Sequence, residues 1–84
     1  MSETVLDEVA YRRDFSDRYE RAGYTYRQFA PAYRYGRQLA EDDLFRGKDW
    51  KVIEVSVYRQ WEGQNPNTWE QVKDAVKQGF LQTQ

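Results

Sequence analysis

The 84-residue chain has no cysteine and no histidine. A disulfide is therefore excluded, and a structural zinc site would lack its usual ligands. A serine or threonine nucleophile would have no histidine to activate it. The sequence also contains no glycine-rich phosphate loop and no EF-hand spacing. We therefore predict that the protein is not an enzyme and that it binds no metal and no cofactor.

Aliphatic residues and long apolar runs are also scarce. The chain has four Leu and one Ile, and 32% of its residues are charged. No apolar run approaches the roughly 20 residues that span a bilayer. Residues 1–10 are acidic and lack the basic and apolar regions of a secretory signal. We expect a soluble, cytoplasmic protein without a membrane span.

Aromatic residues are abundant instead, at 17% of the chain. Each ring can bury on the order of 150–250 Å². A chain this short buries little surface on folding, so these rings have to supply most of the core. The residues expected in the core on this basis are Phe29, Tyr33, Trp50, Trp61 and Trp69.

Apolar residues recur at helical spacing over residues 10–22 and 69–81, which predicts two helices. Between them we expect a short turn over residues 26–29, followed by a helix from Pro31 to about residue 41, because proline suits a first helical turn. Gly36 lies inside this helix, where glycine costs about 1 kcal/mol relative to alanine. It therefore predicts the close approach of another helix or of an aromatic ring.

Residues 50–62 allow two interpretations. Trp50, Ile53, Val57 and Trp61 recur at helical spacing, whereas residues 53–57 alternate strictly and are rich in β-branched side chains, which is typical of a strand. We favour a helix, since a single strand would have no partner.

The predicted fold class is thus all-α. We expect a small bundle of three main helices plus a short or N-terminal fourth helix, with an aromatic-rich core. This single helical domain covers residues 10–82, and residues 1–9 form a flexible acidic tail.

Residues 24–37 combine tyrosine and arginine at high density. In one interpretation the rings belong to the core, and the arginines stack on them or pair with acidic flanks. Tyrosine and arginine are also enriched at protein–protein hot spots, and they form stacking platforms for single-stranded nucleic acid. The net charge of −1 counts against nucleic acid, whose binding depends on uncompensated positive charge. The candidate interaction surface consists of Tyr24, Arg27, Arg34, Tyr35 and Arg37.

The functional hypothesis is therefore a non-enzymatic interaction or accessory module that binds a partner protein or a second copy of itself. The alternative is a nucleic-acid-binding module that uses the same Tyr/Arg face. The acidic run at residues 41–43 lacks the ligand spacing of a metal loop, so we expect it to be solvated.

Several motifs carry a resemblance to a known family. They are PAYRYG at residues 31–36, RGKDW at residues 46–50 and NPNTWEQVKDAV at residues 65–76. With these motifs the chain resembles a family of short bacterial proteins of unknown function that also occurs in cyanobacteria. The resemblance covers about residues 11–80. It implies an association with stress or envelope homeostasis, and it implies no activity, cofactor or catalytic residue.

Overall fold

A computed structural model describes the backbone of residues 5–83 and the side chains from residue 8 onwards. This part of the chain is helical and contains no strand, so the all-α prediction is confirmed. In chain order the elements are α1 (Val5–Arg18), the short 3-10 helix η1 (Glu20–Ala22), α2 (Tyr26–Glu41), α3 (Trp50–Gln64) and α4 (Trp69–Thr83).

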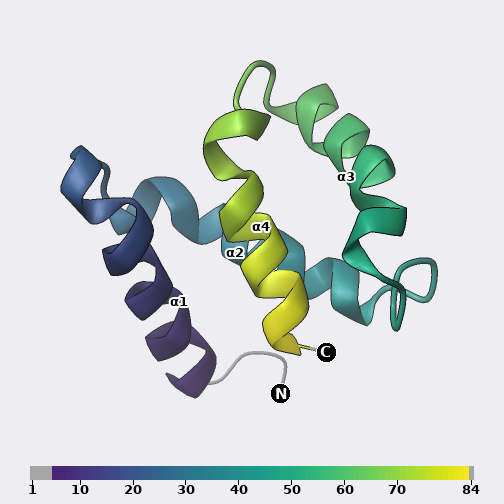
Figure 1. Cartoon of the computed structure of the whole chain (residues 1–84), viewed down its shortest axis with the longest axis horizontal. Coiled ribbons are helices and arrows are strands. Elements are labelled where there is room, and N and C mark those ends of the chain that lie inside the picture. The colour runs from purple at the N-terminus through teal and green to yellow at the C-terminus, as the bar shows by residue number, and fades with distance from the viewer. Residues whose placement is uncertain (1–4, 84) are drawn as a thin grey trace.

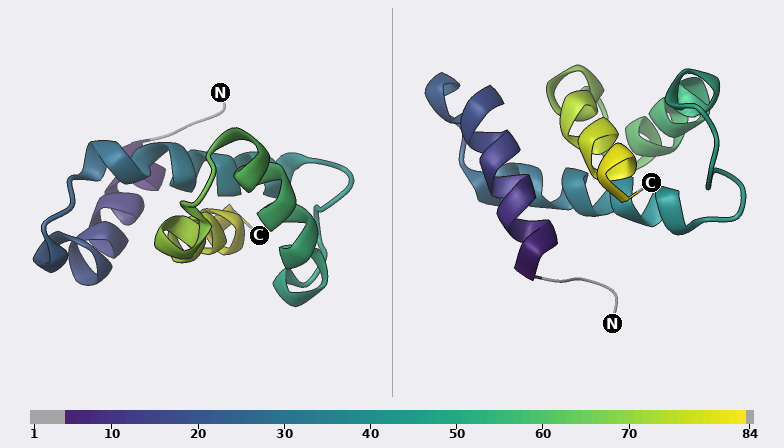
Figure 2. Two further views of the ribbon diagram at one scale, coloured as in Figure 1. Left: turned by 90° about the horizontal axis from the view of Figure 1, so that it is seen from above. Right: turned by 60° about the horizontal axis from the view of Figure 1, so that its bottom comes forward.

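The helices form two layers (Figures 1 and 2). α2 makes one layer, and α1, α4 and α3 lie side by side against one face of it, with α4 in the middle. The molecule is correspondingly flat, with extents of 33 × 31 × 19 Å. The opposite face of α2 carries the exposed side chains of Arg27, Pro31, Arg34 and Gln38. We call these four residues the outer face of α2.

The contact between α2 and α4 is made by backbone against backbone. A Cβ atom on Gly36 would overlap the carbonyl oxygen of Val76, and one on Gly79 would overlap the carbonyl oxygen of Tyr33. Both glycines are buried, so the two helices cross where neither has a side chain. The close approach predicted from Gly36 is confirmed, while the equal requirement for Gly79 was not predicted.

Two groups of aromatic rings fill the space beside this crossing. Between α1 and α2, the rings of Tyr19 and Phe29 stack with centroids 4.0 Å apart, and those of Tyr11 and Tyr33 stack at 5.2 Å. A second group joins α3 and α4. All five residues expected in the core are buried, which are Phe29, Tyr33, Trp50, Trp61 and Trp69.

A polar link joins three helices at the edge of the first aromatic group. The hydroxyl of the buried Tyr33 donates to Asp14 Oδ2 at 2.7 Å, and Arg18 Nε donates to Asp14 Oδ1 at 2.9 Å. Arg18 also faces Asp74 of α4 at 3.8 Å. Burial, followed by the hydrogen bond to Asp14, raises the pKa of Tyr33 well above that of a free phenol. This phenol therefore stays protonated and keeps its hydrogen bond at any ordinary pH.

Two boundaries near the N-terminus differ from expectation. α1 begins at Val5 rather than near Ala10, so half of the expected tail is helical, and residues 1–4 lie outside the described part. The first helix ends at Arg18, and η1 completes the predicted segment. Gly23 ends this segment with a φ of 93°, which favours glycine.

The predicted break before Pro31 is wrong. α2 runs continuously from Tyr26, with Thr25 as its N-cap, and Pro31 lies inside it. The backbone N–H of Thr25 donates to Gln28 Oε1 at 2.8 Å, which fixes the first turn ahead of the proline. Pro31 is tolerated because its ring faces solvent, although the carbonyl of Arg27 then lacks its helical donor.

Residues 50–62 are helical, as favoured, because α3 buries its apolar stripe against the rest of the core. The connection before it was expected to pack Leu44 and Phe45 against the core. Phe45 is buried, but Leu44 is 69% exposed. The backbone N–H of Leu44 donates to Asp42 Oδ1 at 2.9 Å within this turn.

The turn between α3 and α4 is organised by Glu62. Its carboxylate accepts the backbone N–H groups of Asn67 at 2.8 Å, Thr68 at 3.2 Å and Trp69 at 3.0 Å. These bonds lower the pKa of Glu62 because they stabilise its charged form. The negative charge also lies at the N-terminus of α4, where its interaction with the helix dipole stabilises the helix.

Because α2 and α4 cross at Gly36 and Gly79, we predict that alanine is not tolerated at either position. Gly36→Ala and Gly79→Ala should each lower the free energy of unfolding by about 2 kcal/mol or more, because backbone atoms of the facing helix cannot move aside independently. Gly63→Ala is the matched control, since nothing lies within 4 Å of its Cβ position. Urea unfolding followed by tryptophan fluorescence measures all three. Equal stability of Gly36→Ala and Gly63→Ala would contradict the crossing.

The three hydrogen bonds to the Glu62 carboxylate predict that the stability of the fold depends on pH. The folded-state pKa of Glu62 lies below the ordinary value of 4.5, so its contribution is complete at neutral pH and is lost as the pH falls through the folded-state pKa. Glu62→Gln should therefore unfold at lower urea than wild type at neutral pH, and the difference should shrink at about pH 3. Asp17→Asn is the control, since this exposed carboxylate lies on α1, outside the turn between α3 and α4. A pH-independent difference for Glu62→Gln would contradict this account.

Candidate binding surface between α1 and α2

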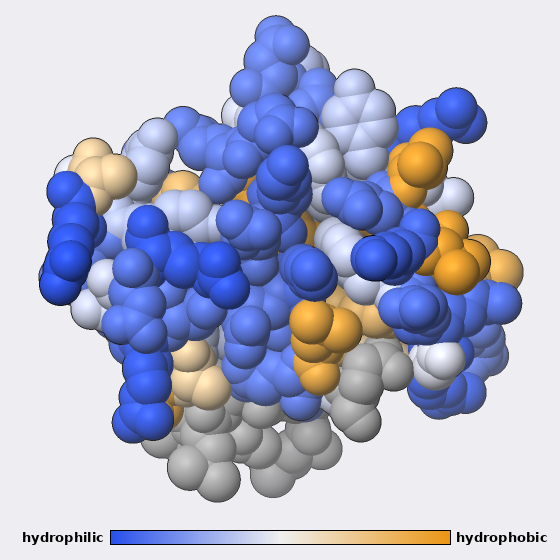
Figure 3. Space-filling view, in the orientation of Figure 1, coloured by the Kyte–Doolittle hydropathy of each residue, from blue (hydrophilic) through white to orange (hydrophobic). Residues whose placement is uncertain are grey.

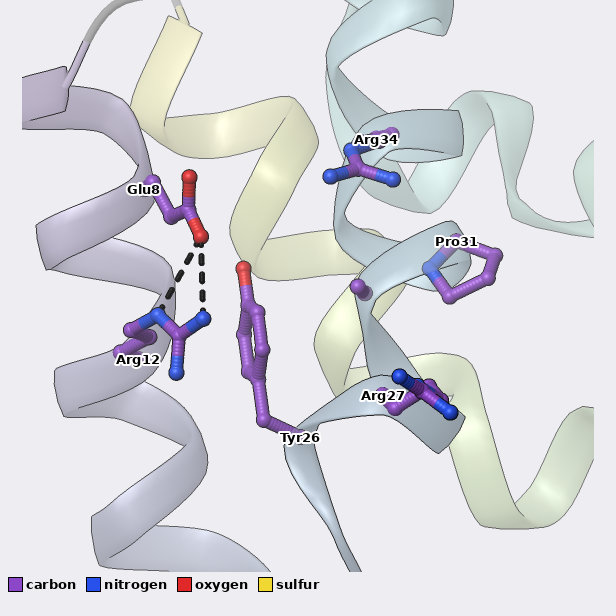
Figure 4. Close-up of a pocket in the computed structure, with 7 residues that line it drawn as sticks. Glu8, Arg12, Tyr26, Arg27, Pro31 and Arg34 are labelled. Carbon is purple, nitrogen blue, oxygen red and sulfur yellow. Dashed lines mark hydrogen bonds and ion pairs between the residues drawn. The ribbon is translucent and has the colours of Figure 1, made fainter.

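A hollow of about 530 Å³ lies between α1 and the outer face of α2 (Figure 4). Three arginines and one glutamate give its lining a net positive charge. We call it the arginine hollow. Its lining residues are Glu8, Arg12, Tyr26, Arg27, Ala30, Pro31 and Arg34.

Tyr26 stands between the two helices that form the hollow (Figure 4). The guanidinium carbon of Arg12 lies 4.2 Å from the centroid of its ring, which is a cation–π contact. The ring of Tyr33 stacks on Tyr26 at 6.2 Å with an interplanar angle of 25°, and the edge of Phe15 meets it at 5.8 Å. Tyr26 is therefore fixed in place and forms a rigid wall of the hollow.

Arg12 is also held by an ion pair within α1. Its Nε and one terminal nitrogen donate to Glu8 Oε2 at 3.2 and 3.1 Å, as the dashed lines of Figure 4 mark. Burial raises the pKa of Tyr26, and the nearby charge of Glu8 raises it further. The hollow thus presents guanidinium groups and a protonated phenol at neutral pH.

The structure brings the five candidate surface residues together only in part: Arg27 lies with Arg34 in this hollow, and Arg34 lies with Tyr35 in the hollow beside it. Arg27 and Arg34 both lie on the outer face of α2 and line the arginine hollow. Tyr24 lies on the other side of Tyr26, half-buried, with its ring edge-on to Phe29 at 5.1 Å. Tyr24 therefore belongs to the aromatic core as much as to the surface.

Tyr35 and Arg37 also differ from the other candidates. The ring of Tyr35 packs against Trp61 at 5.3 Å, and its hydroxyl donates to Gln60 Oε1 at 3.0 Å. Burial raises the pKa of Tyr35. The side chain of Arg37 is only 14% exposed, and its Nε lies 3.3 Å from Glu41 Oε2. The side chain of Arg37 is thus largely buried, and it lines neither this hollow nor the one that contains Tyr35.

Five residues of the arginine hollow were not predicted as a site, and three of them have polar or charged side chains. Glu8 and Arg12 come from α1, and only their i,i+4 spacing could have linked them. Tyr26 belongs to the Tyr/Arg segment, but nothing in its sequence position distinguishes it from Tyr24. Glu8, Arg12 and Tyr26 lie near Arg27 and Arg34 only because of the way in which α1 packs against α2.

Other parts of the surface are weaker candidates for a binding site. Exposed apolar side chains gather over α3 (Figure 3), where Val52 and Val55 are 71% and 59% exposed. With Tyr58, which is 44% exposed, they form a short apolar stripe on this helix, and exposed apolar side chains of this kind are normal on a protein surface. In the acidic run, Glu41 and Asp43 each pair with an arginine.

The described residues contain no group of three or more Asp, Glu, His or Cys side chains that could hold a metal ion. Within residues 5–83, no helix has both the length and the apolar character needed to cross a membrane.

Comparisons with known proteins give no family for this chain. No family model matches it, and searches of curated proteins and of solved structures find no significant match. The resemblance drawn from its motifs, with the stress association that it implies, therefore stays a prediction.

Arg37 is largely buried and Arg27 is exposed, so replacing each with alanine should change the free energy of unfolding by different amounts. Arg37→Ala should lower the free energy of unfolding by about 1 kcal/mol, since it removes a packed aliphatic stem and the pair with Glu41. Arg27→Ala should change it by less than about 0.5 kcal/mol, because Arg27 is exposed. Thermal and urea unfolding of both variants checks this. An equal loss in the two variants would contradict the assignment.

Proposed function

We propose that this protein is a non-enzymatic interaction module that binds an acidic segment of a partner protein in the arginine hollow. The charge of the hollow carries the proposal, because Arg12, Arg27 and Arg34 line it and Glu8 is the one carboxylate among its lining residues. Guanidinium groups match carboxylates in shape and can donate two parallel hydrogen bonds to them.

The rigidity of Arg12 supports the same function. Two of its three guanidinium nitrogens donate to Glu8, and its face rests on Tyr26. A partner carboxylate can take the third nitrogen without reorganising the side chain. Because the arginine is already ordered, binding loses less conformational entropy than it would with a free side chain.

The protonation of the hollow favours recognition over catalysis. Guanidinium groups do not release a proton in proteins. The pKa of Tyr26 is raised by burial, so its phenol keeps its proton near neutrality. Glu8 is bonded to Arg12. These groups are suited to holding an anion, and a general acid or base with a pKa near neutrality is not among those described.

Single-stranded nucleic acid is the alternative ligand, and the ring geometry disfavours it. Stacking platforms need a ring face open to a base. The guanidinium group of Arg12 lies over the ring of Tyr26, and the ring of Tyr33 packs against it in an offset stack. Tyr24 and Tyr35 are half-buried against Phe29 and Trp61. The positive charge of the hollow therefore comes without the stacking surface that bases require.

Fluorescence anisotropy with three labelled probes tests the proposal: hexaglutamate, hexalysine and a ten-nucleotide oligothymidine. Hexaglutamate should bind at low salt, and the double variant Arg27→Ala/Arg34→Ala should weaken it about tenfold, because two exposed charge contacts are worth about 1–2 kcal/mol together. Arg21→Ala/Arg59→Ala removes the same charge outside the hollow and should have little effect.

The outcomes separate the hypotheses. An equal loss in both double variants, or no binding of hexaglutamate at low salt, would overturn the proposed function. Tighter binding of oligothymidine than of hexaglutamate, dependent on Arg27 and Arg34, would replace it with the nucleic-acid alternative.

A further inference from the structure

A second hollow adjoins the arginine hollow along α2. Its volume is about 330 Å³, and it shares Pro31 and Arg34 with the first. We call it the amide hollow. Its five further lining residues, from α2 and from the end of α3, are Tyr35, Gln38, Trp61, Gln64 and Asn65.

The lining of the amide hollow differs in chemistry from that of the arginine hollow. Gln38, Gln64 and Asn65 are exposed carboxamides, which can each donate and accept hydrogen bonds. The polar ends of the two rings are already bonded, since Tyr35 donates to Gln60 at 3.0 Å and Trp61 donates to Thr68 at 2.7 Å. Because Trp61 is only 9% exposed, the accessible apolar surface of this hollow comes mainly from the half-buried ring of Tyr35.

The carboxamides favour one kind of ligand. They donate and accept hydrogen bonds, so they suit a ligand whose own backbone N–H and C=O groups need partners. An extended peptide has such groups along its whole length, whereas a helix satisfies most of its own.

The length of the joined surface sets the length of the ligand. Arg27 and Gln38 lie eleven residues apart on α2, which corresponds to about 16 Å at the helical rise. An extended chain covers that distance with about five residues.

We propose that the two hollows form one groove for an extended peptide, with acidic residues in the arginine hollow and an apolar or aromatic side chain about five residues away in the amide hollow. This inference rests on the proposed function, since it takes the arginine hollow as the site of the acidic residues. It adds the second half of the ligand and its extended conformation.

Three labelled peptides test the groove by fluorescence anisotropy: EEE, EEEGSGA and EEEGSGF, each with acetylated or labelled ends. Affinity should rise in that order, with EEEGSGF binding at least tenfold tighter than EEE. The variant Gln38→Ala/Gln64→Ala should reduce this ratio about fivefold and leave the affinity for EEE unchanged. Ser56→Ala removes an exposed polar side chain outside both hollows and should leave the ratio unchanged.

The outcomes distinguish a failure of the continuous groove from a failure of the proposed function. If the three peptides bind equally, or if the ratio survives in Gln38→Ala/Gln64→Ala, the continuous groove is overturned while the arginine hollow stands. If none of the peptides binds at low salt, the proposed function fails and the groove with it. Urea midpoints of the variants show whether a loss reflects unfolding.

Discussion

The backbones of α2 and α4 touch at Gly36 and Gly79, and the rest of the fold depends on this contact. A Cβ on either residue would overlap a carbonyl oxygen of the other helix. α4 can therefore sit directly on α2, and α1 and α3 pack on its two sides (Figure 1). Aromatic rings fill the remaining space, which lets a chain with few leucines and isoleucines build a continuous core. The two glycines thus set the layer arrangement that the rings complete.

This arrangement also decides where a binding surface can form. With the other three helices on one face of α2, the residues of its outer face remain exposed. Pro31 is compatible with a continuous helix because it lies on this face, where a missing N–H leaves a carbonyl near solvent rather than in the core. α1 then brings Glu8 and Arg12 to the edge of the same face. The constraint that holds the core together therefore leaves an arginine-lined surface on the opposite side of α2.

The periodicity of apolar residues predicted the all-α fold class and the core tryptophans, but it placed a break before Pro31 where α2 is continuous. The close approach at Gly36 was predicted from the cost of a glycine inside a helix. Gly79 carries the same helical cost, yet its partner could not be identified without knowing which helices cross. The candidate surface was predicted from adjacency in the sequence, but a helix separates adjacent residues. Arg27 and Arg34 lie seven residues, about two turns, apart and share a face. Arg37 lies ten residues from Arg27 and points to another side, where it pairs with Glu41. Tyr24 and Tyr35 are half-buried because a tyrosine ring can pack while its hydroxyl stays wet.

We propose that the outer face of α2, with the edge of α1, is the recognition surface of this fold. A titration of the ¹⁵N-labelled protein with the peptide EEEGSGF, monitored through the amide chemical shifts, tests this. The largest shift changes are expected at Arg12, Arg27 and Arg34 and at the side-chain amides of Gln38 and Gln64. Largest changes on the outward face of α3 around Val52 and Val55, or no changes at low salt, would contradict it.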